Sequence, residues 1–381
     1  MIIAKQIGAN DQRDGAHSLC VFHAGHDSHA RECVGFGSGC YAVLKSTFLS
    51  SLRNIIMFTR LTFTVVVGVA FFAGLFTANV RAAEVDPFDQ SDVPLEVDTT
   101  DAKATKIILV AGAMSVGSKP RKHEYFAGCA LLADMLKKTE GVHPVMVLGG
   151  WPKDEKIFEG AKAIVFYMDG GGKQPFVLDK AKGDKITALV KQGVGIVHLH
   201  QVIDYPIGPG EMAIAWMGGA YQPKVSARGH WDSTFDNFPE HEITRGVKPF
   251  ELNDGFLVKM KWTEDVKRVT PLLFTDAKSK VAKPSLDACI AWAYERADGG
   301  RSFTYTGIDG HEAWELEGLR KFTVNGILWS AKVAIPKEGA SAEFDQTLLN
   351  RHFDRKGGAK PAVKPAVKPV AKPAVKAKTD K

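Results

Sequence analysis

Short, continuous apolar runs alternate with longer amphipathic stretches through the middle of the chain. The runs at 106–112, 144–148, 163–168 and 194–199 are typical of strands covered on both faces. Apolar residues at helical spacing occur over 123–139 and 180–192. Strands that alternate with helices in this way predict an α/β fold with a doubly wound, mostly parallel sheet.

The pattern becomes looser after residue 204. Short strands are predicted at 269–274, 289–294 and 301–306, between loops rich in glycine and proline, and a last helix is predicted at 319–331. A hydrophobic content of 45% is enough for a sizeable core. We therefore expect one folded domain over 104–337, with a linker at 83–103 before it.

The N-terminal region predicts export. Residues 57–82 have a short basic start, an apolar run at 61–78 and small residues at a cleavage site, as secretory signals do. We expect a periplasmic or secreted protein. The alternative is that 61–78 remains as a membrane anchor, because about 18–20 apolar residues can span a bilayer. Residues 1–56 show no periodicity, and we interpret them as a disordered, non-native upstream extension.

The net charge of +6 gives little information about partners, because it comes from the C-terminal end. Nine basic residues and one acid follow from Arg355 onward, a net +8, which leaves the rest near −2. We expect 338–381 to be a disordered, Lys/Pro/Ala-rich tail. Its charge could bind an anionic envelope surface, although a solvated tail is the simpler interpretation. No specific nucleic-acid partner is expected.

Polar residues follow three predicted strands at the ends where parallel strands meet. Ligands of open α/β sheets bind at this carboxyl edge. The residues expected there are Asp169, Gly170, Gly171, His200, Asp204 and His311. Local pattern alone also fits a flexible glycine turn and a histidine that only hydrogen-bonds its loop.

Further candidates lie at the start of a helix and in loops. His123 and Glu124 begin the first predicted helix, whose N–H groups point toward the same edge, although Glu124 would also suit the helix dipole. His230 and Trp314 lie in predicted loops. Aromatic faces beside polar groups suit sugar rings, but a single tryptophan is more often a core residue.

Metal ligation is a second interpretation of the histidines. His198 and His200 form a His-x-His pair, of which His200 is nearer the strand end. The residues that could complete a site are scattered along the chain: His123, Glu124, Asp169, His230 and His311. A divalent metal therefore stays open as a cofactor, and its ligands are not specified.

Four segments in order along the chain resemble the ThuA-like (trehalose-utilisation) family. They are the opening strand at 106–112, GVGIVHLH at 193–200, NFPEHEITRG at 237–246 with FELND at 250–254, and GRSFTYTGIDGH at 300–311. The resemblance implies a flavodoxin-like sheet related to class I glutamine amidotransferases, and an association with sugar utilisation. Gly255 departs from the pattern, because many members carry an acid at this position.

Glutamine amidotransferase activity is not expected. Those enzymes place a cysteine on a sharp turn after the central strand. The strand at 194–199 is followed by His200 and Gln201, and no Gly-x-Cys-x-Gly occurs there. Cys129 and Cys289 lie on other predicted elements, where core residues are the simpler interpretation.

The leading hypothesis is an exported ThuA-like protein that acts on a small carbohydrate or modified sugar. His200 and His311 would be acid/base or ligand-orienting groups, since histidine transfers protons near neutral pH. The reaction type could be hydrolysis, isomerisation or elimination. Two alternatives remain: a non-catalytic sugar-binding or envelope-associated module, and a metal-dependent hydrolase.

Overall fold

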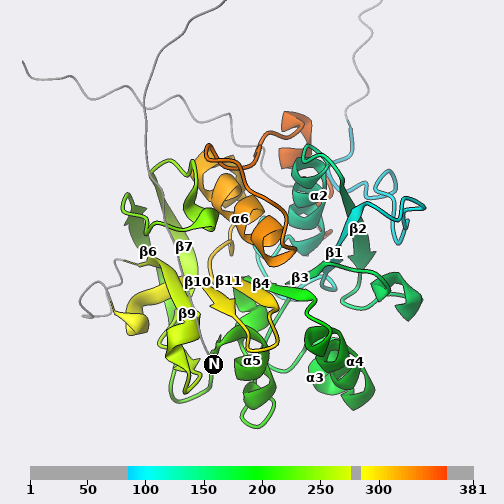
Figure 1. Cartoon of the computed structure of the whole chain (residues 1–381). Helices are drawn as coiled ribbons and strands as arrows, with labels where there is room; N and C mark the ends of the chain where they lie inside the picture. The colour runs from blue at the N-terminus through cyan, green and yellow to red at the C-terminus, as the bar shows by residue number, and fades with distance from the viewer. Residues whose placement is uncertain (1–84, 276–284, 358–381) are drawn as a thin grey trace, which may run out of the picture. The chain divides into compact units, whose positions relative to one another are not determined.

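The computed structural model describes residues 85–275 and 285–357. A seven-stranded sheet forms its centre, in the order β2-β1-β3-β4-β11-β10-β9 (Figure 1). The strands are β1 Thr105–Ala111, β2 Val142–Leu148, β3 Ala163–Tyr167, β4 Gly195–Leu199, β9 Val269–Phe274, β10 Cys289–Glu295 and β11 Arg301–Tyr305. β10 runs antiparallel to β11 and β9, and the others pair in parallel. The expected doubly wound, mostly parallel α/β fold is thus confirmed.

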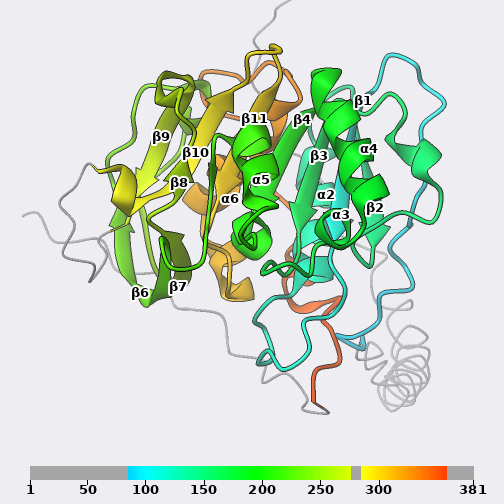
Figure 2. The same ribbon diagram turned by 90° about the horizontal axis from the view of Figure 1, so that it is seen from below.

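Helices cover both faces of the sheet (Figures 1 and 2). α2 (Tyr125–Leu136) and α6 (Glu317–Ser330) pack on one face. α3 (Pro175–Leu178), α4 (Lys180–Lys191) and α5 (Gly210–Met217) pack on the other. The apolar runs of β1, β3 and β4 are fully buried between these two layers, as their sequence predicts.

Smaller elements are added to this frame. A two-stranded antiparallel ribbon, β6 (Ala227–Phe235) and β7 (Phe250–Val258), lies beside the sheet, and β5 (Gly219–Ala220) pairs with β8 (Lys261–Trp262). Single turns of 3-10 helix are η1 Glu155–Phe158, η2 His200–Ile203, η3 Glu242–Thr244, η4 Val266–Arg268, η5 Leu286–Ala288, η6 His311–Glu315 and η7 Gln346–Asn350.

The folded body extends beyond the expected 104–337 at both ends. Ala340, Ala342 and Phe344 are buried in the core, so the chain after 337 is not yet a solvated tail. Gln90 donates to the His352 carbonyl at 2.9 Å, and the Phe353 N–H donates to the Pro87 carbonyl at 2.9 Å. The segments at 86–98 and 338–357 therefore belong to the fold, because each provides partners for the other.

Three predicted segments lie outside the described residues: the upstream extension at 1–56, the export signal at 57–82 and the lysine-rich end from 358 onward. Between 85 and 357, leaving out 276–284, the structure contains no helix with the length and apolar character to cross a bilayer. Cys129 and Cys289 are buried free thiols, and burial raises the pKa of Cys289 to about 12.

Candidate functional site

Ionisable side chains converge at the carboxyl edge of the parallel strands. Asp169 follows β3, His200 follows β4 and Asp309 follows β11. His123 joins them from the turn before α2. His123, His200 and Asp309 each present a ligand atom within 4.8 Å of the other two. The site thus lies at the edge where ligands bind in open α/β sheets.

His200 occupies the sharp turn that follows the central strand. Its φ of +60° lies in the left-handed region, which breaks the alternation of β4 and turns the imidazole toward the carboxyl edge. The ring is buried, and its Nδ1 lies 3.2 Å from the Thr306 carbonyl. Because a carbonyl only accepts, the Nδ1 donates to it, and the Nε2 lone pair faces the cluster.

His123 is held in a similar way. Its φ is +56°, its Nδ1 lies 3.1 Å from Asp169 Oδ1, and its Nε2 lies 2.9 Å from Asp309 Oδ1. Burial alone would lower the pKa of His123, but its hydrogen bonds to Asp169 and Asp309 outweigh burial and raise it. A proton shared with these two carboxylates is therefore favoured when no metal is bound.

Asp309 is the centre of the cluster. Its Oδ1 faces His123 and also lies 3.5 Å from His200 Nε2, while its Oδ2 accepts from Lys122 Nζ at 2.9 Å and His230 Nε2 at 2.8 Å. Burial would raise the pKa of Asp309, but the hydrogen bond with His123, the contact with His200 and the charge of Lys122 hold it far below its usual range. Asp309 is therefore a carboxylate near neutral pH.

A buried acid on the neighbouring ribbon fixes the loop that carries Asp309. The Asp254 carboxylate accepts from three successive backbone N–H groups, those of Ile308, Asp309 and Gly310, at 2.6, 3.1 and 3.1 Å. Gly255, the next residue on β7, leaves room for the contact between His230 and Asp309: a Cβ there would lie 2.9 Å from His230 Nε2. The ribbon therefore fixes the Asp309 loop through Asp254 and contributes His230 to the site.

Asp169 is surrounded by donors. It accepts from Ser115 Oγ at 2.9 Å, Tyr125 OH at 2.5 Å and Lys173 Nζ at 2.9 Å, in addition to His123. Burial would raise the pKa of Asp169, but hydrogen bonds from His123, Tyr125, Lys173 and Ser115 lower it well below its usual range. Its charge fixes which nitrogen of His123 carries the proton.

The geometry of three atoms fits a tetrahedral cation. His123 Nε2, His200 Nε2 and Asp309 Oδ1 are separated by 3.3, 2.9 and 3.5 Å. A tetrahedral Zn²⁺ with ligands at about 2.0 Å holds neighbouring ligand atoms about 3.3 Å apart. The outer nitrogen of each imidazole is bound to a carboxylate or a carbonyl, as is usual for histidines that ligate metals.

The structure places three other predicted residues close to this edge, in structural contacts. A Cβ on Gly170 would lie 1.9 Å from the Gln201 carbonyl, so glycine permits the loop after β3 to approach η2. The Gly171 N–H donates to the Asp204 carbonyl at 2.7 Å, and the Asp204 carboxylate pairs with Arg228 at 2.9 Å. These contacts assemble the edge and give no sign of a ligand.

Glu124 does not reach the cluster. Its carboxylate is buried, accepts the N–H groups of Arg121 and Asp354 at 2.9 Å each, and pairs with Lys356 at 3.1 Å. Because all these partners belong to the turn before α2 and to the C-terminal segment, Glu124 connects parts of the chain. A role in holding substrate, expected from its position at the helix start, does not follow from this geometry.

His311 and Trp314 are not brought into the cluster either. Both are buried in η6, which turns into the core directly after Gly310. The His311 ring packs against Phe353, and burial lowers the pKa of His311 to about 3. Trp314 is 0% exposed and belongs to the core cluster that includes the buried residues of α2 and α6. The indole ring is therefore not accessible to a sugar.

Sequence reasoning overlooked Asp309, Lys122, Ser115 and Tyr125. Asp309 could have been found from the sequence, because it follows β11 in the same glycine-rich segment as His311. An acid at that strand end meets the residues that follow β3 and β4. Ser115 and Lys122 lie in the loop before α2, whose path no periodicity predicts, and Tyr125 is the first residue of α2.

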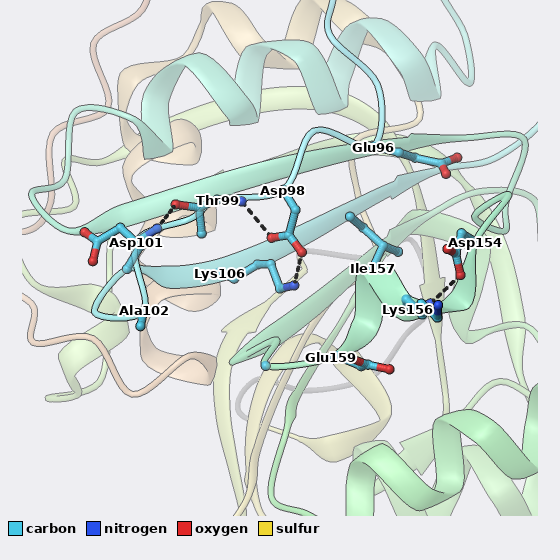
Figure 3. A pocket seen from close by; sticks show the side chains of 12 residues that line it. Glu96, Asp98, Thr99, Asp101, Ala102, Lys106, Asp154, Lys156, Ile157 and Glu159 are labelled. Carbon is cyan, nitrogen blue, oxygen red and sulfur yellow. Dashed lines mark hydrogen bonds and ion pairs between the residues drawn. The ribbon is translucent and has the colours of Figure 1, made fainter.

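A sizeable cavity lies at the opposite edge of the sheet. Its volume is about 540 Å³, and Figure 3 shows it lined by acidic side chains and by Lys106, which pairs with Asp98 at 2.7 Å. Two smaller cavities, of about 280 and 350 Å³, flank the loop that carries Ser115. Asp169 and Lys173 line the first of these, and Ser115 lines the second, so both open beside the cluster.

Comparison with known proteins agrees with the sequence blocks. The sequence model of the ThuA family, described as trehalose utilisation, matches residues 116–330. Similar solved structures include two proteins described as ThuA-like. That of Bacteroides uniformis has 15% identity, covers 64% of this chain and 97% of its own, and has a TM-score of 0.45. That of Parabacteroides merdae has 13% identity, covers 65% and 99%, and has a TM-score of 0.45.

A third similar structure, PurLQS of Thermotoga maritima, has 13% identity, covers 60% of this chain and 98% of its own, and has a TM-score of 0.36. None of the curated proteins matches the chain. The resemblance seen in the sequence blocks is confirmed by the family match, which spans more than half of the chain. The chain therefore belongs to the ThuA family.

Proposed function

We propose that the chain is an enzyme that acts on a carbohydrate and that it holds a divalent cation of the Zn²⁺ type with His123, His200 and Asp309. One observation carries the proposal: three lone-pair atoms of these residues face one another at 2.9 to 3.5 Å. Such atoms repel unless a proton or a metal cation lies between them, and a metal ion can serve all three at once. The outer ring nitrogens are already bound, which leaves the inner ones available as ligands.

The residues around the proposed metal site would have separate roles. A bound Zn²⁺ supplies a Lewis acid that polarises a sugar oxygen or a water molecule. Asp169 keeps His123 in the ligating tautomer, and Lys122 neutralises the outer oxygen of Asp309. His230, whose side chain is 56% exposed, is the most exposed histidine of the cluster and could contact a bound hydroxyl group directly.

The carbohydrate substrate rests on two supports. The family is described by trehalose utilisation. The site combines charged hydrogen-bonding groups with small cavities lined by Met114, Val116, Met168 and Pro175, whose apolar surfaces suit the C–H face of a sugar.

Metal content tests the proposal directly. Protein purified without a metal-affinity tag should carry about one zinc per chain by mass spectrometry. His200→Ala and Asp309→Ala should lose it. His143→Ala is the matched control, since His143 lies on β2 and bonds to the Val97 carbonyl, away from the cluster. Wild-type protein that binds no divalent metal under any loading condition refutes the proposed centre.

Turnover distinguishes an enzyme from a binding module. Wild type and His200→Ala are incubated with a panel of disaccharides and oxidised sugars, each with and without zinc. Loss of turnover in His200→Ala with retained folding supports catalysis. Sugar binding by calorimetry without any turnover supports the non-catalytic module instead.

We also propose that the protein is exported, with 57–82 as a cleaved signal. The support is the order of basic, apolar and small residues in that segment. N-terminal sequencing of the protein recovered from the cell envelope and medium should give a start after residue 82. A start at or before residue 61 contradicts cleavage and favours an anchor.

A further inference from the structure

The turn that carries His123 is held in an unfavourable backbone conformation. Arg121 and His123 have φ values of +64° and +56°, in the left-handed region that side chains other than glycine rarely adopt. Such residues persist only where the surrounding structure holds them. What holds this turn therefore also determines where the His123 imidazole lies.

One side of the turn is bound to the loop of Asp309. The His123 N–H donates to the Asp309 carbonyl at 3.0 Å, and the His311 N–H donates to the Arg121 carbonyl at 2.8 Å. These two bonds form a short antiparallel bridge between Lys122 and Gly310. Two of the proposed metal ligands are thus connected through their backbones.

The other side of the turn is bound by Lys356. This lysine is only 5% exposed, and its Nζ donates to the Lys122 carbonyl and, at 3.1 Å, to the His123 carbonyl. The same Nζ lies 3.1 Å from Glu124 Oε1. One buried ammonium group therefore uses its three donors on three successive residues of the turn.

The segment that carries this lysine, residues 351–356, is the C-terminal strap. Phe353 packs under the Arg121 guanidinium, and the Asp354 N–H donates to Glu124 at 2.9 Å. The strap is itself bound by the N-terminal segment, through Pro87 and Gln90. Both segments lie outside residues 116–330, the region that matches the family.

We propose that Lys356 is a positioning residue, and that the C-terminal strap is a built part of the metal site. By binding two carbonyls and the acid of the turn, Lys356 fixes the backbone of His123 so that Nε2 faces His200 and Asp309. This inference rests on the proposed function, because its effect is read through the metal.

Zinc affinity of the full chain tests the inference, measured by competition with a chromophoric chelator. Lys356→Met should bind Zn²⁺ about 10–100-fold more weakly than wild type, as expected when a group that orients a ligand is lost. Lys106→Met is the matched control. It removes a lysine that is 6% exposed and paired with Asp98 at 2.7 Å at the opposite edge of the sheet.

Lys356→Met leaves Glu124 buried without a cation, so Lys356→Met/Glu124→Gln provides the second variant. It should recover the melting temperature of the metal-free protein but keep the weak zinc affinity. Affinity within threefold of wild type in either variant overturns the inference, as does an equal loss in Lys106→Met. A double variant that fails to fold, while Lys106→Met folds, also counts against a local role. Wild type that binds no zinc refutes the proposed function instead.

Discussion

Gly255→Ala tests whether the outer oxygen of Asp309 has to be held by His230. The added Cβ would lie 2.9 Å from His230 Nε2, closer than real Cβ contacts allow, and 3.0 Å from Asp309 Cβ, which is also tight. The φ of Gly255 is not positive, so the effect arises from space and not from backbone strain. To restore contact near 3.4 Å, the imidazole has to move by about half an ångström, which can stretch the bond of 2.8 Å to about 3.3 Å, beyond the usual range of about 2.7–3.2 Å.

The magnitude follows from the bond that is lost. A hydrogen bond to a charged group contributes about 1.5–3 kcal/mol, and the exposure of His230 favours the lower end. Since about 1.4 kcal/mol corresponds to a factor of ten, zinc affinity should fall about tenfold. Crowding the ribbon should also lower the stability of the metal-free protein by about 1–3 kcal/mol.

Chelator competition and thermal denaturation measure these two effects. Gly229→Ala is the control, since Gly229 lies one pair away in the same ribbon and its Cβ would meet only the Trp231 ring. His230→Ala should show the same affinity as Gly255→Ala, because both remove one interaction. The orienting role of His230 is refuted if a crystal structure of Gly255→Ala shows the bond between His230 and Asp309 broken while the zinc affinity is unchanged.

Three other predictions follow from the site. Asp169→Asn should weaken zinc binding by about tenfold, because a neutral amide polarises His123 less; equal affinity by competition assay would contradict this. The pKa of metal-free His123 is raised, so its protonated form stabilises the fold at low pH, and this contribution is lost as the pH rises above 6.5 through the raised value. Melting curves in chelator should show this loss in wild type and not in His123→Gln, while zinc affinity rises over the same interval. His311→Leu should keep metal content and turnover, since His311 is buried away from the cluster; lost turnover in a folded variant would restore it as a catalytic residue.

The sequence predicted those elements whose signal is local. The apolar runs located the ends of β1, β3 and β4 to within about a residue. A strand buried on both faces is a continuous apolar run, so its ends are marked by the first polar residues on either side. The ribbon of β6 and β7 was not predicted, since most of β6 is exposed and shows no apolar alternation. The order of β9, β10 and β11 depends on pairing between distant segments, which local pattern does not contain.

The candidate site was predicted in part, for the same reason. His123, Asp169 and His200 lie in the cluster, because strand ends and helix starts can be located from periodicity. His230 also lies there, although it was expected in a loop and stands within β6. Asp309 and His311 are only two residues apart, and the direction of each side chain depends on a left-handed residue, Ile308, with a φ of +67°. A β-branched residue in that conformation cannot be foreseen from sequence pattern.

The left-handed backbone of His200 has a consequence for laboratory evolution. A residue other than glycine or asparagine at φ +60° costs about 1–2 kcal/mol. Variants selected only for resistance to heat should therefore accumulate glycine or asparagine at this position and lose the imidazole. Libraries screened for thermal stability alone would therefore enrich stable variants that lack this proposed metal ligand.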